Sequence, residues 1–198
     1  MIDKALSLLS EELQNYLMNS PEAADVSIDN IGMLETSNSD GLNRHIVITL
    51  VNVEEESALK NISPLKKGVS GMAAYENPPV FLNLYVLITC NYSGTDYILA
   101  LMRLSAVIRF FQSRNSFSTR NTTSVTAPSS DTVDLKFTME LYTLTFEQIN
   151  HLWGSLGGRQ VPFVMYKLRV VAITDRAVVR TVPIVEEIET NLYKIPNN

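Results

Sequence analysis

The sequence predicts an α+β fold, a single domain in which a mixed β-sheet is covered by helices. Segments with apolar residues at every third or fourth position are interspersed with segments in which apolar residues recur at every second position. In chain order they read as a helix, strands, a long loop, a strand, a helix, a strand, a helix and a strand. The chain has 198 residues, 45% apolar and 19% charged, which suffices for one domain with its own core.

The first helix is predicted at the start of the chain, where apolar residues recur at helical spacing from Ile2 to Leu17. Proline cannot continue a helix, so the run Asn19-Ser20-Pro21 ends it. We expect the polar residues between the apolar positions to face water, namely Glu11, Glu12 and Gln14.

A second helix is predicted over residues 96–114, with Thr95 as its N-cap. The expected buried stripe consists of Ile98, Leu101, Leu104, Ile108 and Phe111. So many apolar residues predict that this helix is the main cover of the sheet.

A third helix is predicted after Thr145, because Thr145 and Gln148 have the spacing of a capping box. Trp153 falls on its apolar face and is expected in the core. Gly157-Gly158 supplies the left-handed conformation that ends many helices. This pair is therefore a stop signal and not a phosphate-binding loop.

Strands are predicted where apolar or β-branched residues alternate. They fall around residues 26–34 and at 45–53, 80–91, 134–142 and 161–174, with a last extended stretch at 178–189. The strand 80–91, the helix 96–114 and the strand 134–142 are expected to form a right-handed parallel crossover. Residues 54–78 read as a long loop, and residues 115–130 as a loop or an edge hairpin.

Composition excludes several classes of protein. The net charge of −5 and the lack of a basic stripe argue against nucleic-acid binding. No apolar run approaches the roughly 20 residues that span a bilayer, and the N-terminus lacks the pattern of a signal peptide, so no membrane insertion is expected. The single cysteine, Cys90, lies in an apolar run and is expected to be a buried, inert thiol.

No catalytic, cofactor-binding or metal-binding residues are predicted, and we expect the chain not to be an enzyme. His45 and His151 are too far apart in sequence to suggest a metal motif, and no serine lies in a nucleophile elbow. Glu54, Glu55 and Glu56 could bind a cation but fit a solvated loop better. A small enzyme whose polar groups converge from the loops 54–78 and 115–130 stays an alternative, as does an adaptor or chaperone-like binding module.

Several motifs resemble one family. Residues 150–171, Asn-His-Leu-Trp-Gly-Ser-Leu-Gly-Gly-Arg-Gln-Val-Pro-Phe-Val-Met-Tyr-Lys-Leu-Arg-Val-Val, are the most distinctive. The opening Met-Ile-x-x-Ala-Leu, the run from Asn77 to Leu87 and the helix end Ile108-Arg-Phe-Phe-Gln also match. Over about residues 1–175 the chain resembles the tail terminator or cap proteins of contractile injection systems, of the antifeeding-prophage and virulence-cassette type. Longer members of that family continue into a C-terminal region that this chain is expected to lack.

The resemblance implies a structural cap. Such proteins form a sixfold ring, a homohexamer, on the end of the tube and sheath, where they end polymerisation and anchor the last sheath layer. The implied partners are further copies of the chain, the sheath protein and the inner tube protein, with no cofactor. The implied location is assembly in the cytoplasm, followed by incorporation into a phage-tail-like particle.

A ring subunit needs a rigid body and extended segments that lie on its neighbours. We expect residues 1–177 to form the terminator-like domain and residues 178–198 to form a C-terminal extended arm. The arm is too apolar for a free tail, so it either adds a strand to a partner's sheet or completes the sheet of its own domain. The candidate partner-interface residues are Lys66, Lys67 and Tyr75 from the loop, and Val179, Val182, Ile184, Val185 and Ile188 from the arm.

Overall fold

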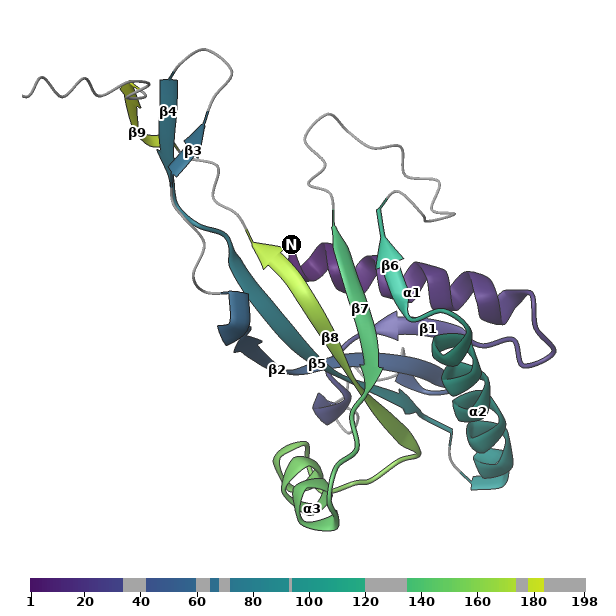
Figure 1. Cartoon of the computed structure of the whole chain (residues 1–198). Helices are drawn as coiled ribbons and strands as arrows, with labels where there is room; N and C mark the ends of the chain where they lie inside the picture. The colour runs from purple at the N-terminus through teal and green to yellow at the C-terminus, as the bar shows by residue number, and fades with distance from the viewer. Residues whose placement is uncertain are drawn as a thin grey trace, which may run out of the picture.

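The computed structural model describes residues 1–33, 42–59, 65–67, 72–92, 94–119, 135–173 and 178–183, and it confirms the α+β fold (Figure 1). The α-helices are α1 (Ile2–Met18), α2 (Tyr97–Ser113) and α3 (Phe146–Ser155). The short 3₁₀ helices are η1 (Ile31–Met33), η3 (Ser57–Leu59) and η4 (Gly94–Asp96). The strands are β1 (Asp25–Ile28), β2 (His45–Glu55), β3 (Leu65–Lys67), β4 (Met72–Glu76), β5 (Val80–Cys90), β6 (Ser116–Ser118), β7 (Lys136–Leu141), β8 (Phe163–Ile173) and β9 (Val178–Pro183).

The main sheet is mixed, as predicted. In the described part of the chain it has six strands, in the order β1-β2-β5-β8-β7-β6. Strands β1 and β2 pair in parallel, whereas the other neighbours are antiparallel. Strands β5 and β7 both run antiparallel to β8, so they are parallel to each other with β8 between them. The expected crossover through α2 therefore joins two strands that are not neighbours, because the later strand β8 occupies the position between them.

A second sheet replaces the long loop predicted over residues 54–78, and that prediction was wrong. Strand β2 continues to Glu55, η3 follows, and β3 and β4 form an antiparallel pair. Strand β9 then pairs with β4 of the same chain, from Met72 opposite Pro183 to Glu76 opposite Val178. Figure 1 shows this three-stranded sheet beyond the ends of β5 and β8, away from the helices.

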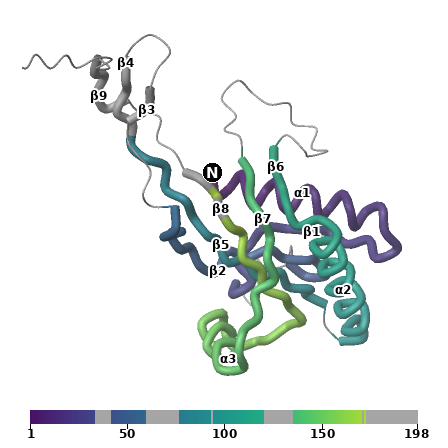
Figure 2. Tube along the Cα trace, viewed as in Figure 1, coloured from purple at the N-terminus to yellow at the C-terminus, as the bar shows by residue number. Residues whose placement is uncertain are grey.

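The backbone trace shows α3 apart from α1 and α2 (Figure 2). The core has two layers, one on each face of the main sheet. Successive side chains of a strand point to opposite faces. Accordingly, Val86 and Ile88 belong to the core beneath α1 and α2, whereas Tyr85 and Leu87 belong to the core beneath α3. Trp153, which is 4% exposed, is buried in the α3 layer as predicted.

The two ends of α3 confirm the predicted signals. The backbone N–H of Gln148 donates to the Thr145 hydroxyl at 3.3 Å, and the Gln148 side chain accepts from the Thr145 N–H at 2.9 Å. Gly157 and Gly158 follow with φ of 99° and 79°, the left-handed conformation that glycine adopts at little cost. The N-terminus of α3 is therefore held in place by its own residues.

On α2, Phe111 is buried as predicted and Leu104 is partly buried against the core, whereas the other three residues of the predicted stripe and the predicted cap were wrong. Ile98, Leu101 and Ile108 are exposed, whereas the helix buries Ala100, Ala106, Val107, Phe110 and Phe111. The adjacent aromatic pair decides the orientation, because Phe110 packs on Tyr16 of α1 and Phe111 packs on Tyr166 of β8. The predicted cap, Thr95, lies inside η4, and α2 begins after Asp96, which pairs with Arg44 at 3.0 Å.

Two of the three polar residues expected to face water on α1 are instead used to attach it. The side chain of Gln14 donates to the Ala24 carbonyl at 3.2 Å and accepts from the Val26 N–H at 2.6 Å, which ties α1 to β1. Glu12 is 4% exposed and pairs with Arg114 at the end of α2. Glu11 is exposed, as expected.

We expect Arg114→Ala to destabilise the protein by about 2–3 kcal/mol, because it withdraws the guanidinium that faces a buried carboxylate. Arg109→Ala is the matched control on the same helix. Its side chain is 59% exposed and lies 3.7 Å from Glu22, so its loss is expected to cost about 0–1 kcal/mol. Urea unfolding of both variants measures the difference, and equal midpoints would contradict the structural role of Arg114.

Candidate functional site

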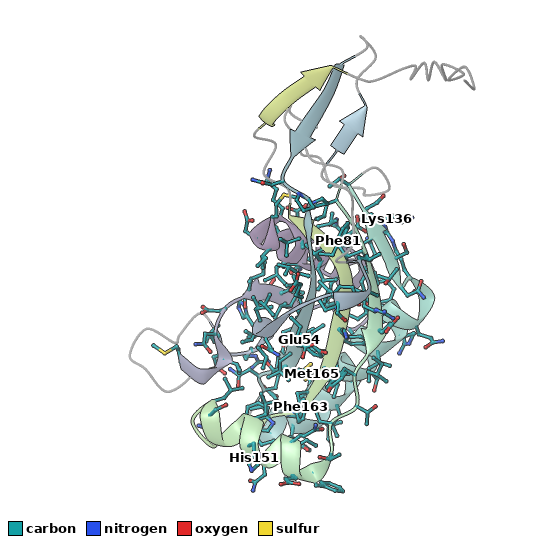
Figure 3. The ribbon with its side chains drawn as sticks, turned by 60° about the vertical axis from the view of Figure 1, so that its left-hand side comes forward. Glu54, Phe81, Lys136, His151, Phe163 and Met165 are labelled. Atoms are coloured by element: carbon teal, nitrogen blue, oxygen red, sulfur yellow. The ribbon has the colours of Figure 1, made fainter. Side chains whose placement is uncertain are left out.

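Helix α3 covers only part of its face of the sheet, and polar side chains occupy the part beyond it. Figure 3 shows Glu54 and Met165 between α3, marked by His151, and the opposite end of the sheet, marked by Phe81. Glu54 and Glu56 follow the buried half of β2, where its burial pattern turns from buried to exposed. This acidic face gathers titratable groups from four segments of the sheet.

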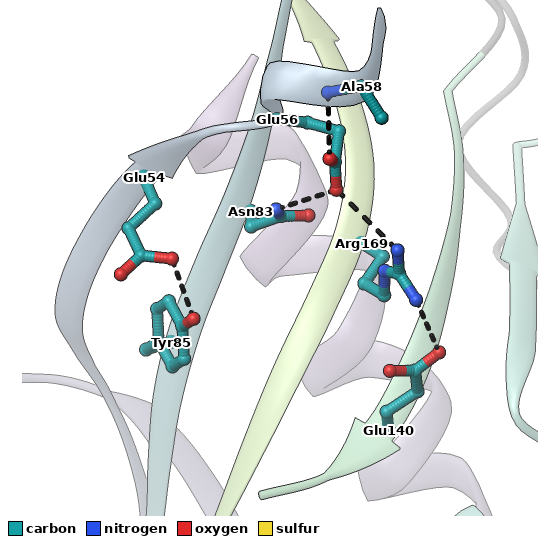
Figure 4. A network of polar contacts seen from close by, with 7 residues as sticks. All are labelled: Glu54, Glu56, Ala58, Asn83, Tyr85, Glu140 and Arg169. Atoms are coloured by element: carbon teal, nitrogen blue, oxygen red, sulfur yellow. Dashed lines mark hydrogen bonds and ion pairs between the residues drawn. The ribbon is translucent and has the colours of Figure 1, made fainter.

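The first contact joins β2 to β5 (Figure 4). The Tyr85 hydroxyl donates to the Glu54 carboxylate at 2.7 Å. This hydrogen bond, helped by desolvation, raises the pKa of Tyr85 above its ordinary value, so the phenol keeps its proton at neutral pH. The ammonium of Lys167 lies 5.2 Å from the centre of the same ring.

A second set of contacts links Glu56, which directly follows β2, with β5, β8 and β7 (Figure 4). The Glu56 carboxylate accepts from the Asn83 amide at 2.9 Å and from the Ala58 N–H at 3.2 Å. Arg169 lies 3.6 Å from Glu56 and 3.2 Å from Glu140. The Asn83 hydrogen bond is the main cause that lowers the pKa of Glu56, and the bond to Glu140 raises the pKa of Arg169. Both shifts favour the charged forms, so the chain of contacts is an ionised clamp across the sheet.

A shallow hollow lies beside this clamp, with a cavity volume of about 230 Å³. Its lining includes Glu54, Tyr85, Tyr142, Gln148 and Met165. A second hollow of about 410 Å³ lies near the end of β1 and includes Asp29, Asn30 and Thr49. Thr49 is already committed, because its hydroxyl donates to the Asp29 carbonyl and accepts from the Ile31 N–H. Neither lining contains a histidine or a cysteine.

The chemistry of these groups is that of structural contacts. A general acid or base that works near neutral pH needs a pKa near that pH, whereas Glu56 is shifted away from it. Burial raises the pKa of the Cys90 thiol to about 12, which fits the inert thiol predicted from the sequence. Within the described ranges, no group of three or more potential ligands is placed to hold a metal ion. No helix among the same residues is both long and apolar enough to cross a bilayer.

The structure brings five of the predicted interface residues onto one small sheet. Lys66 and Lys67 lie on β3, Tyr75 lies on β4 and Val179 and Val182 lie on β9. In the register, Val182 is opposite Ala73, and Ala73 is opposite Lys67. The other three candidates, Ile184, Val185 and Ile188, lie outside the described residues.

Sequence reasoning missed a different surface, the exposed apolar face of α2. It includes Ile98, which is 72% exposed, together with Met102 and Leu101. Apart from this surface, the aromatic residue Phe146 is 92% exposed at the start of α3. The sequence did not reveal the exposed face of α2, because apolar residues surround most of this helix and the face that packs on the sheet carries the small residues Ala100 and Ala106 beside Phe110. A helix with two apolar faces has one that its own sheet cannot cover.

The fold is similar to that of two solved structures. One similar solved structure is the sheath/tube terminator of an extracellular contractile injection system, PVC, in its extended state, with a TM-score of 0.64 and 15% identity over 99% of this chain. Another is the tube-terminating cap of the anti-feeding prophage, with a TM-score of 0.63 and 16% identity over 97% of this chain. The chain spans 64% and 61% of the lengths of these two proteins.

The sequence itself assigns the family. Residues 5–187 match the family described as the Pvc16 N-terminal domain, and the chain belongs to this family. A comparison with curated proteins finds no match. The resemblance inferred from the motifs around Trp153 and along β5 is therefore confirmed at the level of family and fold.

The clamp predicts an acid-dependent stability. The pKa of Glu56 is lower in the folded chain than its ordinary value of 4.5, so its contribution is present above about pH 4.5 and is lost as the pH falls through the folded value. Glu56→Gln removes this contribution. We expect a lower Tm than wild type at pH 7 and a difference that shrinks towards pH 3.

Thermal unfolding followed by circular dichroism between pH 3 and 7 measures this dependence. Glu147→Gln, a change to an exposed glutamate outside the clamp, is the control and is expected to follow the wild-type curve. A Glu56→Gln protein whose Tm falls with acid as steeply as that of wild type would show that Glu56 does not contribute in this way.

Proposed function

We propose that this chain is a structural terminator, or cap subunit, of a contractile injection system. In this proposal, copies of the chain form a ring on the end of the tube and sheath, where the ring ends polymerisation and anchors the last sheath layer. The supporting observation is that nearly the whole chain superposes on two proteins described as a sheath/tube terminator and a tube-terminating cap. The family assignment over residues 5–187 supports the same reading from sequence.

The features of the molecule fit a structural role. Its titratable side chains on the acidic face are occupied in contacts between strands, and the two hollows are shallow. Its surface instead offers exposed apolar side chains on α2 and α3 and a small sheet set apart from the helices. We therefore propose that the chain binds partners and is not an enzyme.

The proposed partners are the sheath protein, the inner tube protein and further copies of the chain in a sixfold ring. The small sheet with Lys66, Lys67, Tyr75, Val179 and Val182 is a proposed contact with these partners, and so is the proposed C-terminal arm of residues 178–198, whose first residues form β9 of that sheet. Assembly is proposed to take place in the cytoplasm before the chain becomes part of a phage-tail-like particle.

Deletion of the coding sequence tests the proposed function. We expect particles whose tubes and sheaths vary in length and lack a closed end, because nothing stops subunit addition. Electron micrographs give the length distributions, and expression of the wild-type chain in trans is expected to restore a single length. Particles with closed ends and an unchanged length distribution in the deletion strain would overturn the proposal.

The ring predicts a definite mass. A sixfold assembly has about six times the chain mass of 22.1 kDa. Multi-angle light scattering of the purified chain, or counting of copies per particle end by cryo-electron microscopy, measures it. A chain that is monomeric in solution and present as a single copy on particles would contradict the ring.

A further inference from the structure

The exposed face of α2 carries an apolar strip. Its members are Tyr97, Ile98, Leu101, Met102 and Ile108, with exposures between 40% and 72%. Residues three, four or seven positions apart lie on one side of a helix, so 97, 101 and 108 form one row and 98, 102 and 109 form the next. Two polar residues lie within these rows, because Ser105 is four positions after Leu101 and Arg109 is seven positions after Met102. The solvent-facing side of a surface helix is normally polar. An exposed apolar strip of this kind indicates a contact surface.

The chain carries a matching apolar projection on α3. Phe146 is the first residue of α3 and is 92% exposed. The capping box between Thr145 and Gln148 holds the backbone on either side of it. A bulky aromatic side chain on a fixed backbone loses little conformational entropy on binding, which is the character of an interface anchor.

The two surfaces are complementary in charge. Residues 97–113 of α2 contain no acidic residue, and Arg109 is the exposed cation beside the strip, whereas Arg103 is turned towards the Ala23 carbonyl and the Tyr92 ring. Residues 146–155 of α3 contain Glu147, next to Phe146, and no lysine or arginine. The Arg109 side chain is 59% exposed, and its ion pair with Glu22 is long, at 3.7 Å. The guanidinium can therefore also meet a carboxylate from another molecule.

The two surfaces cannot meet within one molecule. Helix α2 packs on one core layer of the sheet and α3 packs on the other, so the sheet lies between them. One copy therefore presents the strip on one side and Phe146 on the other. Contact between different patches of identical subunits is heterologous, and it repeats until it closes into a ring.

We propose that Phe146 of one copy docks on the α2 strip of the next copy, with Glu147 facing Arg109. The inference rests on the proposed function, because it assigns the two surfaces through which ring neighbours would meet. The occupant of the strip is thus a second copy of this chain. The small sheet and the remaining surfaces stay available for the tube and sheath.

Two variants, each with one of the two surfaces disabled, test this contact. Phe146→Asp removes the anchor, and the double variant Ile98→Asp with Met102→Asp disrupts the strip. All three side chains are exposed, so both proteins are expected to keep the wild-type circular dichroism spectrum and nearly the wild-type Tm. We expect each variant alone to be monomeric, with an association constant reduced at least about 30-fold.

Mixing the two variants in equal amounts separates this contact from others. Each still owns one intact surface, so the mixture is expected to form a heterodimer with a single working contact and no ring. His151→Asp changes another exposed residue of α3 and is the control, expected to assemble like wild type. Glu147→Arg and Arg109→Glu are each expected to weaken association about 2- to 5-fold, and their combination is expected to restore it.

The outcomes distinguish this inference from the proposed function. Rings of wild-type size from both variants would overturn the docking contact and leave the terminator proposal standing. A folded α2 variant that is monomeric and gains no partner on mixing would also overturn it, since that result indicates a strip-to-strip contact. If wild type forms no ring in solution, the same variants are scored on particles, where capping at wild-type occupancy would overturn the contact.

Discussion

The central constraint on this structure is that strand β5 is buried on both faces. Every residue from Asn83 to Cys90 is buried, and the strand lies between β2 and β8 in the middle of the sheet. A strand of this kind needs an apolar layer above and below it. Helices α1 and α2 supply one layer, and the short helix α3 supplies the other through Trp153, which meets Phe163 of β8 edge to face.

Where α3 ends, the structure changes from apolar packing to ionic contacts. The side chain of Asn83 lies at this border and donates to Glu56, which also faces Arg169. These side chains connect the strands on the part of this face that α3 does not cover. The arrangement leaves that part of the sheet accessible.

The sequence predicted the elements more reliably than their orientation. Hydrophobic periodicity located α1, α3 and the long strands, and the Thr145–Gln148 and Gly157-Gly158 signals marked the ends of α3. The face of α2 could not be predicted from periodicity, because its apolar residues surround most of the helix. Its orientation follows from aromatic contacts with residues distant in sequence, such as Phe111 with Tyr166.

Local sequence patterns also could not predict which segments pair over long distances in the sequence. Strands β3 and β4 are short and carry little alternation of their own, and β4 gains its second neighbour, β9, from the end of the described chain. Glu12 was misplaced for the same reason, since its partner Arg114 is 102 residues away. The predicted interface residues on β3, β4 and β9 turned out to share one sheet, although their part in an interface stays a prediction.

The connection between the two sheets has a mechanical consequence. Strand β4 leads into β5 through residues 77–79, and β8 ends opposite the start of β5, where Val80 faces Ile173. Tension applied to the small sheet along these strands would pull β5 and β8 lengthwise against β2 and β7. Their ladder hydrogen bonds would then be loaded together in shear and not opened one at a time. A domain connected in this way resists extension along that axis.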